Sequence, residues 1–178
     1  MNHKHEGPIE RWKDNPYGAA LGDMDVMRAL ADTPERLRSL AERMTPDQYA
    51  QSYAPSKWTA GQLFLHLAQT ELAFNMRVRM AITTEAYVVQ PFDQDAWMAR
   101  EPMISGIDAF RGYYAMRQFN MPLYRSLTPA ERRRPLTHPE RGPMLVEWIL
   151  ETLAGHERHH LKHVETIAAG HGGSHPLR

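Results

Sequence analysis

Long helical stretches dominate this sequence and limit the folds that it can adopt. Residues 58–82 carry leucines and aromatic side chains at the spacing of a helix face, and residues 19–44, 107–127 and 144–169 are also predicted to be helical. No segment shows a convincing alternation of apolar and polar residues, and the most strand-like run, AYVVQPF, is short and contains a proline. Four main helices with short to moderate links predict an all-α fold, a four-helix bundle over residues 19–169.

Threonine–proline pairs mark the predicted helix starts. Thr33 and Pro34 fall inside residues 19–44, where threonine is a good N-cap and proline suits a first helical turn. This stretch is therefore predicted to be either one kinked helix or a short helix followed by a longer one. The same pair at residues 45–46 and 128–129 predicts two further turns of helix.

The connections and the chain ends are predicted to be irregular. Residues 1–18 are polar and read as an extended arm, and residues 170–178 read as a flexible tail. Within residues 83–105, FDQDAWMAR is predicted to form a short helix. THPERGP is predicted to be a loop before the last helix, and Pro122 is expected to bend the third long helix.

Composition excludes several classes of function. The 178 residues suggest one domain. The 21 basic and 21 acidic side chains balance, so the sequence lacks the excess of basic charge that is typical of nucleic-acid binding. Cysteine is absent, which excludes disulfides, thiolate metal sites and a cysteine nucleophile. The N-terminus has no apolar signal core, and no run is long enough for a membrane span. We expect a soluble, cytoplasmic protein without membrane partners.

Histidines cluster near the C-terminal end, in the stretch GHERHHLKHVE. At about 100° per residue, His156 and His160 lie about 40° apart on the helix and share the apolar stripe of the core. His163 falls on the same side, whereas His159 is offset toward the flank. Two histidines four residues apart can aim at one point from a single helix, which is a good chelating arrangement.

A third ligand would have to come from another helix, and His66 is the natural candidate. It lies in FLHLAQTE between two leucines, on a face that also carries Thr70. A single buried histidine is more often a hydrogen-bonded core residue, and a histidine-rich helix face is often solvated. Three buried imidazoles are costly unless something satisfies their nitrogens. The pattern alone leaves a metal site and a structural bundle with core histidines both open.

Three separated motifs, SKWTAGQLFLHLAQTE, FDQDAW and LAGHERHHLKHVETI, resemble the DinB/YfiT-like superfamily of proposed metalloenzymes, closest to its DinB-like branch. The resemblance covers about Leu30 to Ile167. It implies a four-helix bundle with a divalent metal, often zinc or nickel, on His66, His156 and His160. In the family the position of His159 is often histidine without being a ligand. The position of His163 is more often glutamine, so His163 departs from the pattern.

The resemblance also implies a chemistry. Some members transfer a low-molecular-weight thiol such as bacillithiol or mycothiol, and others are described only as metal-dependent hydrolases. Three histidines leave metal positions open, as in catalytic zinc sites. The expected function is therefore a metal-dependent thiol transferase or hydrolase that acts on a small molecule. The alternative is a non-enzymatic protein that binds a metal or small ligand in a stress response. Relatives often pair through helix faces, so a homodimer is expected.

No general base is evident from the sequence. Glu71 lies five residues after His66 and points about 140° away from it. Asp93 and Asp95 could enter the cavity if their loop covers it, although capping of the short helix explains them equally well. Together with Thr70, and with His159 and His163 of the C-terminal stretch, they are the candidate pocket or supporting residues.

Overall fold

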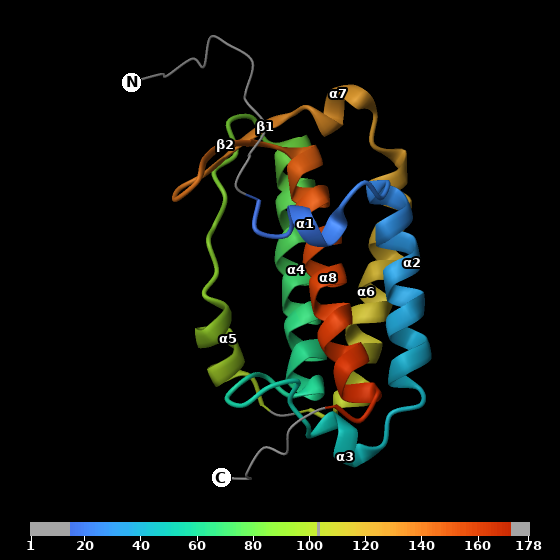
Figure 1. The fold of residues 1–178 in the computed structure, drawn as a ribbon. Helices are drawn as coiled ribbons and strands as arrows, with labels where there is room; N and C mark the ends of the chain where they lie inside the picture. The colour runs from blue at the N-terminus through green and yellow to red at the C-terminus, as the bar shows by residue number, and fades with distance from the viewer. Residues whose placement is uncertain (1–14, 103, 172–178) are drawn as a thin grey trace.

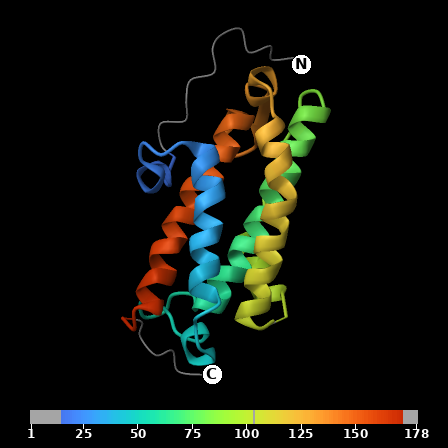
Figure 2. The ribbon, with the colours of Figure 1, turned by 90° about the vertical axis from the view of Figure 1, so that its right-hand side faces the viewer.

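Four long helices run side by side as a bundle in the computed structural model, which describes residues 15–102 and 104–171 (Figures 1 and 2). They are α2 (Val26–Ala41), α4 (Ala60–Thr83), α6 (Gly106–Ser126) and α8 (Val146–Ala168). Helix α4 packs against α6 and α8, and α2 packs against the same two helices from the other side. The predicted all-α four-helix bundle is therefore confirmed, with α2 diagonal to α4.

Side-chain caps set where the helices begin. The hydroxyl of Thr59 accepts a hydrogen bond from the Gln62 backbone N–H, and the Gln62 side chain accepts from the Thr59 N–H, which together form a capping box at the start of α4. The short helices α3 (Pro46–Tyr49) and α7 (Pro129–Arg132) begin with the same box at their threonines. Both threonine–proline turns predicted between long helices are therefore confirmed, as is the short helix α5 (Gln94–Arg100).

Of the two alternatives for this stretch, a helix boundary at Thr33 and Pro34 is wrong. A short helix does precede a longer one, but α1 (Gly18–Leu21) ends at Gly22, whose φ of 59° suits glycine. Asp25 then caps α2, which continues through Pro34 without interruption.

Tertiary structure compensates for this proline. Proline has no N–H, so the helix leaves the carbonyl four residues earlier, that of Leu30, without its usual donor. The side chain of Arg117 on α6 donates to that carbonyl from Nη1 at 3.0 Å. The sequence around Pro34 gives no sign of this distant donor.

A β-hairpin stands where a loop was predicted. Strand β1 (Pro135–His138) pairs antiparallel with β2 (Gly142–Leu145), and Val88 forms a parallel bridge with Thr137. Consequently the last helix begins after β2, two residues later than predicted. The strands are too short to show a period of two, which explains the error; the strand-like run AYVVQPF does contribute the bridging residue.

The described end of the predicted N-terminal arm packs against α8. A Cβ on Gly155 would lie 2.5 Å from the carbonyl oxygen of Tyr17, so glycine permits this close approach. Residues 1–14 of the arm and 172–178 of the predicted tail lie outside the described part. Among the described helices, none is both long and apolar enough to cross a membrane.

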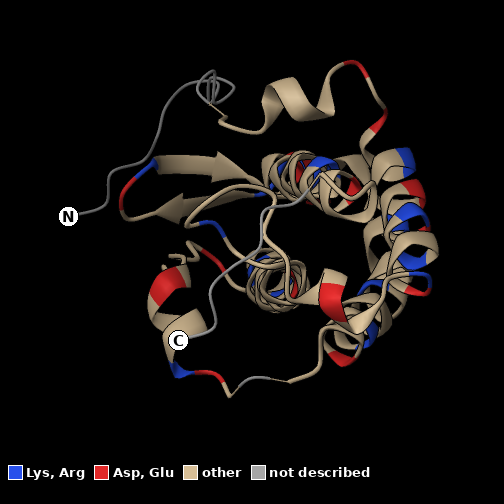
Figure 3. Ribbon diagram, turned by 60° about the horizontal axis from the view of Figure 1, so that its bottom comes forward, with Lys and Arg blue, Asp and Glu red and all other residues tan. Residues whose placement is uncertain are grey.

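Polar residues form a layer between two buried apolar clusters. One cluster includes Leu30, Tyr124 and Leu153, and the other includes Phe64 and Val164. Along α4, α6 and α8, the residues between these clusters include buried histidines, carboxylates and arginines. Basic and acidic residues are interspersed along the helices (Figure 3). The middle layer of the bundle is therefore where its chemistry is concentrated.

Candidate metal centre

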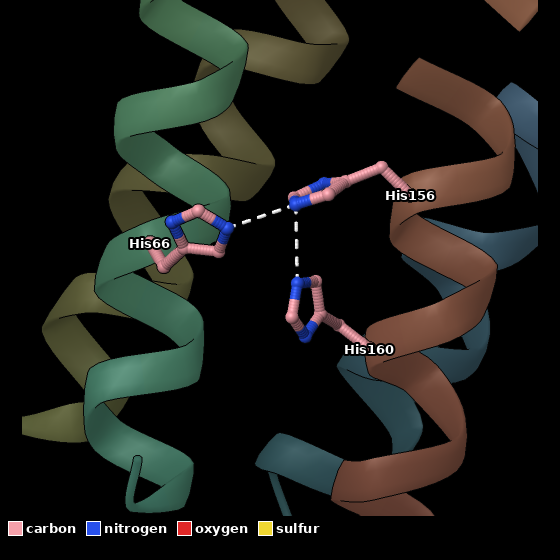
Figure 4. Close-up of side chains that lie close together, drawn as sticks. All are labelled: His66, His156 and His160. Atoms are coloured by element: carbon pink, nitrogen blue, oxygen red, sulfur yellow. Dashed lines mark hydrogen bonds between the residues drawn. The ribbon is translucent and has the colours of Figure 1, made fainter. Parts of the chain in front are cut away.

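Three histidine side chains converge between α4 and α8 (Figure 4). The Nε2 atom of His66 lies 2.8 Å from Nε2 of His156, which lies 3.1 Å from Nε2 of His160. His66 comes from α4, and the other two come from successive turns of α8. The structure thus brings together the three residues singled out in the sequence, with the same nitrogen of each ring directed to one point.

Packing holds these rings in place. The side chains of His66, His156 and His160 are all buried. The ring of Trp58 lies 4.6 Å from that of His66, and the ring of Tyr17 meets that of His156 edge-on at 4.9 Å. Neither aromatic residue was predicted to have a role at the site, and both restrict the rotation of a histidine.

Burial keeps the three imidazoles neutral. It lowers the pKa of His66 to about 4 and that of His160 to about 2, and it lowers the pKa of His156 well below its ordinary value. The mutual repulsion that the rings would feel if charged acts in the same direction on His156 and His160. At neutral pH each ring therefore retains a nitrogen lone pair, which is the form that binds a metal ion.

The hydrogen bonding of the cluster is incomplete. The Nδ1 atoms of His66, His156 and His160 are buried and have no hydrogen-bond partner. A neutral imidazole has one N–H and one lone pair, so contacts among the three Nε2 atoms alone cannot satisfy all six nitrogens. If each ring carries its proton on Nδ1, all three Nε2 lone pairs face one another, which a shared cation would resolve.

These three residues fit a divalent ion. Their ligand atoms lie within 4.8 Å of one another, and three imidazoles with further positions open are the donor set of catalytic zinc sites. Imidazole also suits nickel and copper, so the donor set does not select one metal. The observed Nε2 separations are slightly shorter than the roughly 3.3 Å expected around a tetrahedral ion with bonds of about 2.0–2.1 Å.

A cavity of about 330 Å³ opens beside the histidines. His66 and His156 line it, together with Arg77, His138 and Arg141. Its volume is within the range of pockets that hold small molecules. The cluster is therefore accessible to a bound molecule through this cavity.

The remaining predicted pocket residues fall into two groups. Thr70 lies in the cavity wall, and its buried Oγ1 has no hydrogen-bond partner. His159 and His163 are half-buried on the flank, where His163 stacks on Tyr53 with ring centroids 3.8 Å apart. With His160 these two form a second group of close nitrogens, so His163 does not join the group that contains His66.

Asp93 and Asp95 lie at the start of α5. Asp93 caps α5, because its Oδ1 accepts hydrogen bonds from the backbone N–H groups of Asp95 and Ala96. Both aspartates are exposed, and neither lines the cavity, whereas Phe92 and Gln94 do. The helix-capping interpretation describes Asp93 here.

A second buried polar cluster escaped the sequence analysis. Arg117 of α6 forms ion pairs with Glu71 of α4, at 2.6 Å, and with Glu157 of α8. Asn120 and Tyr124 donate further hydrogen bonds to Glu71. Arg117 and both carboxylates are almost completely buried. The predicted direction of Glu71, away from His66, agrees with this placement.

Comparison with known proteins agrees with this geometry. A relative from Oceanobacillus iheyensis, provisionally named a metal-dependent hydrolase, is 28% identical over 145 residues, which cover 78% of this chain and 81% of that protein. YfiT from Bacillus subtilis is 24% identical over 152 residues, which cover 83% and 85%.

The fold comparison points the same way. A solved structure of YfiT, described as a probable metal-dependent hydrolase with an unusual four-helix bundle topology, matches with a TM-score of 0.76 at 22% identity and covers 92% of both chains. A family model of the DinB superfamily matches residues 29–164, well over half of the sequence. The chain therefore belongs to the DinB superfamily.

Proposed function

We propose that this protein is a metal-dependent hydrolase of a small molecule. One observation carries the proposal: three neutral histidines direct Nε2 to a single point, and two of them line a cavity. The naming of its relatives as metal-dependent hydrolases supports the same reaction class.

The chain's own residues would bind and orient. His66, His156 and His160 would hold the ion, with zinc or nickel as the expected metals. A divalent ion there supplies Lewis acidity and lowers the pKa of a water molecule that it binds. Thr70, one helical turn after His66, offers a buried hydroxyl that can accept one hydrogen bond and donate another to a reactant in the cavity.

Metal analysis of purified protein tests the site. We expect about one zinc or nickel ion per chain after reconstitution. His66→Ala and His160→Ala should lose it, whereas His171→Ala, an exposed histidine outside the cavity, should retain it. Equal metal content in all four proteins would contradict the assignment of ligands.

Turnover must be measured separately. A panel of small esters, amides and related substrates should give product with the metal-loaded protein and none with His66→Ala. Saturable binding without product would favour the alternative of a non-enzymatic binding protein.

A thiol transferase is the second candidate, and the composition of the cavity wall favours it. Among the described residues that line the cavity, Glu140 of the hairpin is the one carboxylate, so no carboxylate stands beside His66 and His156 as a general base. The chain has no cysteine, so any thiol must be a bound cofactor. Product that forms with an electrophile only when a low-molecular-weight thiol is added would select this reaction over hydrolysis.

A homodimer is also proposed. Leu72 and Met76 of α4 and Phe119 of α6 are exposed by 49%, 54% and 74% on helices that pack together. Exposed apolar side chains on one face are typical of an interface. Light scattering should give twice the chain mass, and Phe119→Ser should reduce it; a monomeric native protein would refute the proposal.

A further inference from the structure

We propose that the cavity carries a subsite for an oxyanion, a carboxylate or a phosphate, with Arg77 as its main contact. That the anionic molecule is the substrate rests on the proposed function; the anion subsite itself does not. The argument uses the position of Arg77 on α4, its missing counterion and the charges around it.

Arg77 and His66 lie on the same face of α4. They are eleven residues apart, which at about 100° per residue leaves an angular difference of about 20°. Their Cα atoms are separated by about 16 Å along the helix axis at 1.5 Å per residue. Thr70 and Phe74 lie between them, and all four side chains line the cavity. One wall of the cavity therefore runs from the histidines to Arg77.

Arg77 is a buried cation without a carboxylate partner in the described part of the chain. Its side chain is 7% exposed, and Nη2 donates to the Gln90 carbonyl at 3.2 Å. Its guanidinium lies 4.9 Å from the ring centre of Phe74 and 5.6 Å from that of Phe92. None of the ion pairs among the described residues includes Arg77.

Such a placement is costly unless a ligand compensates for it. Burial of a charged group without its counterion carries a large desolvation penalty. The aromatic rings recover part of that penalty through cation–π contacts. A guanidinium also presents its N–H groups as a planar fork that matches the two oxygens of a carboxylate or phosphate. An oxyanion from a bound molecule supplies the missing partner.

The neighbouring charges favour an anion. Arg141 and His138 line the same cavity as Arg77. Burial lowers the pKa of both Arg77 and His138, and the nearby charge of Arg141 lowers each of them further. Glu140 is the opposing charge; it is exposed, and its backbone N–H donates to Nδ1 of His138. That bond places the proton of a neutral His138 on Nε2, which makes Nε2 a donor.

The two ends of the cavity define the substrate class. The molecule would place its reacting group at the histidines and its oxyanion at Arg77. Because arginine side chains lean back toward the helix N-terminus, the two groups would be on the order of 10 Å apart. Phe74, Met144 and Ile149 supply apolar walls between them. The structure therefore assigns an elongated small molecule with an apolar middle and an anionic end.

A matched set of probes tests the subsite. Octanohydroxamate offers a metal-binding group and an apolar tail, whereas suberic acid monohydroxamate has the same chain length and ends in a carboxylate. A third probe ends in a phosphonate. Affinities are measured by calorimetry on metal-loaded and metal-free protein, for the native chain, Arg77→Gln, Arg77→Lys and Arg79→Gln. Arg79 is the control, because it lies on the same helix but outside the cavity wall.

We expect the native protein to bind one of the anionic probes about tenfold more tightly than octanohydroxamate, since hydrogen bonds to charged groups are strong. Whether the carboxylate or the phosphonate binds more tightly identifies the anion. Arg77→Gln should lose or reverse this preference, Arg77→Lys should retain part of it, and Arg79→Gln all of it.

Two outcomes separate the subsite from the proposed function. Equal affinity of the native protein for all three probes would overturn the subsite, whatever the variants do. If the anionic probe is preferred but each probe binds equally tightly with and without metal, the subsite is supported and the metal does not hold the hydroxamate end, which would count against the proposed function alone.

Discussion

Two buried polar clusters share the middle of this bundle and differ in how completely their polar groups are satisfied. Neighbouring residues of α8, His156 and Glu157, point into different clusters. His66 and Glu71, five residues apart on α4, do the same. In the carboxylate cluster, Arg117 pairs with both glutamates and donates to a carbonyl of α2, so its contacts join all four long helices. The carboxylate cluster also leaves Nε of Arg117 and Oδ1 of Asn120 without a partner, but its charges are paired, whereas in the histidine cluster the Nδ1 atom of every ring lacks a partner.

The difference separates a structural role from a functional one. A polar network whose charges are paired rigidifies the fold, whereas an unsatisfied one costs stability until a ligand completes it. The burial of Glu157 raises its pKa to about 7 although Arg117 opposes this shift. Even in the paired cluster, therefore, the desolvation of this carboxylate is not fully compensated. The carboxylate cluster should therefore respond to mutation as part of the fold, and the histidine cluster as an incomplete site.

The largest expected effect is from Arg117→Met. It leaves two buried carboxylates without a counterion, and we expect a loss of about 3–5 kcal/mol in the free energy of unfolding. Urea denaturation measures this, with Arg111→Met on the exposed side of α6 as a control that should change stability by less than about 0.5 kcal/mol. A loss below about 1 kcal/mol for Arg117→Met would remove the structural half of the comparison.

Metal addition should give the next largest effect. At a free metal concentration about a hundredfold above Kd, binding stabilises the folded state by about 2.7 kcal/mol. His66→Leu should abolish this gain. In the metal-free state the same variant should be as stable as the native chain or slightly more stable, because it replaces an unsatisfied buried imidazole with an apolar side chain. A large loss in the metal-free state would instead identify His66 as a structural core residue.

The sequence predicted the histidine site and missed the carboxylate cluster for physical reasons. Histidines four residues apart on a core stripe are rare enough to stand out, and the third could be found on another helix. Glu71, Glu157 and Arg117 occur at spacings that a solvated helix face also shows. Their mutual contact depends on how α4, α6 and α8 pack together, which periodicity along one helix does not report.

Other errors have the same origin in long-range contacts. The predicted break at Pro34 rested on threonine as an N-cap and proline in a first turn, but the helix continues there, and Arg117 donates from another helix to the carbonyl that the proline leaves without its usual donor. Tyr17 was not singled out because it reaches the cavity wall from a segment far from the histidines in the sequence. Arg77 shares the His66 face of α4, but its burial depends on Gln90 and Phe92 of another segment, which the periodicity of one helix does not report. A glycine in α8, Gly155, was the one local signal for the close approach of the N-terminal segment.

Acidification should reveal the histidine cluster in the metal-free protein. His66 has a pKa of about 4 when folded and about 6.5 when unfolded, so below about pH 6.5 the unfolded chain binds more protons. Stability is fully present above that pH and falls as the pH drops toward 4. Between about pH 7.5 and pH 5 the loss from this one histidine should be on the order of 2 kcal/mol. Urea midpoints of the native chain and His66→Leu should diverge toward low pH, because only the native chain loses the contribution of this histidine; parallel profiles would contradict the shifted pKa.

The smallest expected effects are changes in stability of opposite sign when one buried hydroxyl is removed beside each cluster. Thr70→Val removes a buried hydroxyl without a partner, so the metal-free protein should gain up to about 1 kcal/mol. Tyr124→Phe removes a hydroxyl that donates to Glu71 at 3.2 Å, so stability should fall by about 1 kcal/mol. If both variants lose stability, Thr70 has a structural partner and its proposed role in the cavity fails. If Thr70→Val is more stable than the native protein and also binds a cavity ligand less tightly, the hydroxyl contributes to binding at a cost in the stability of the fold.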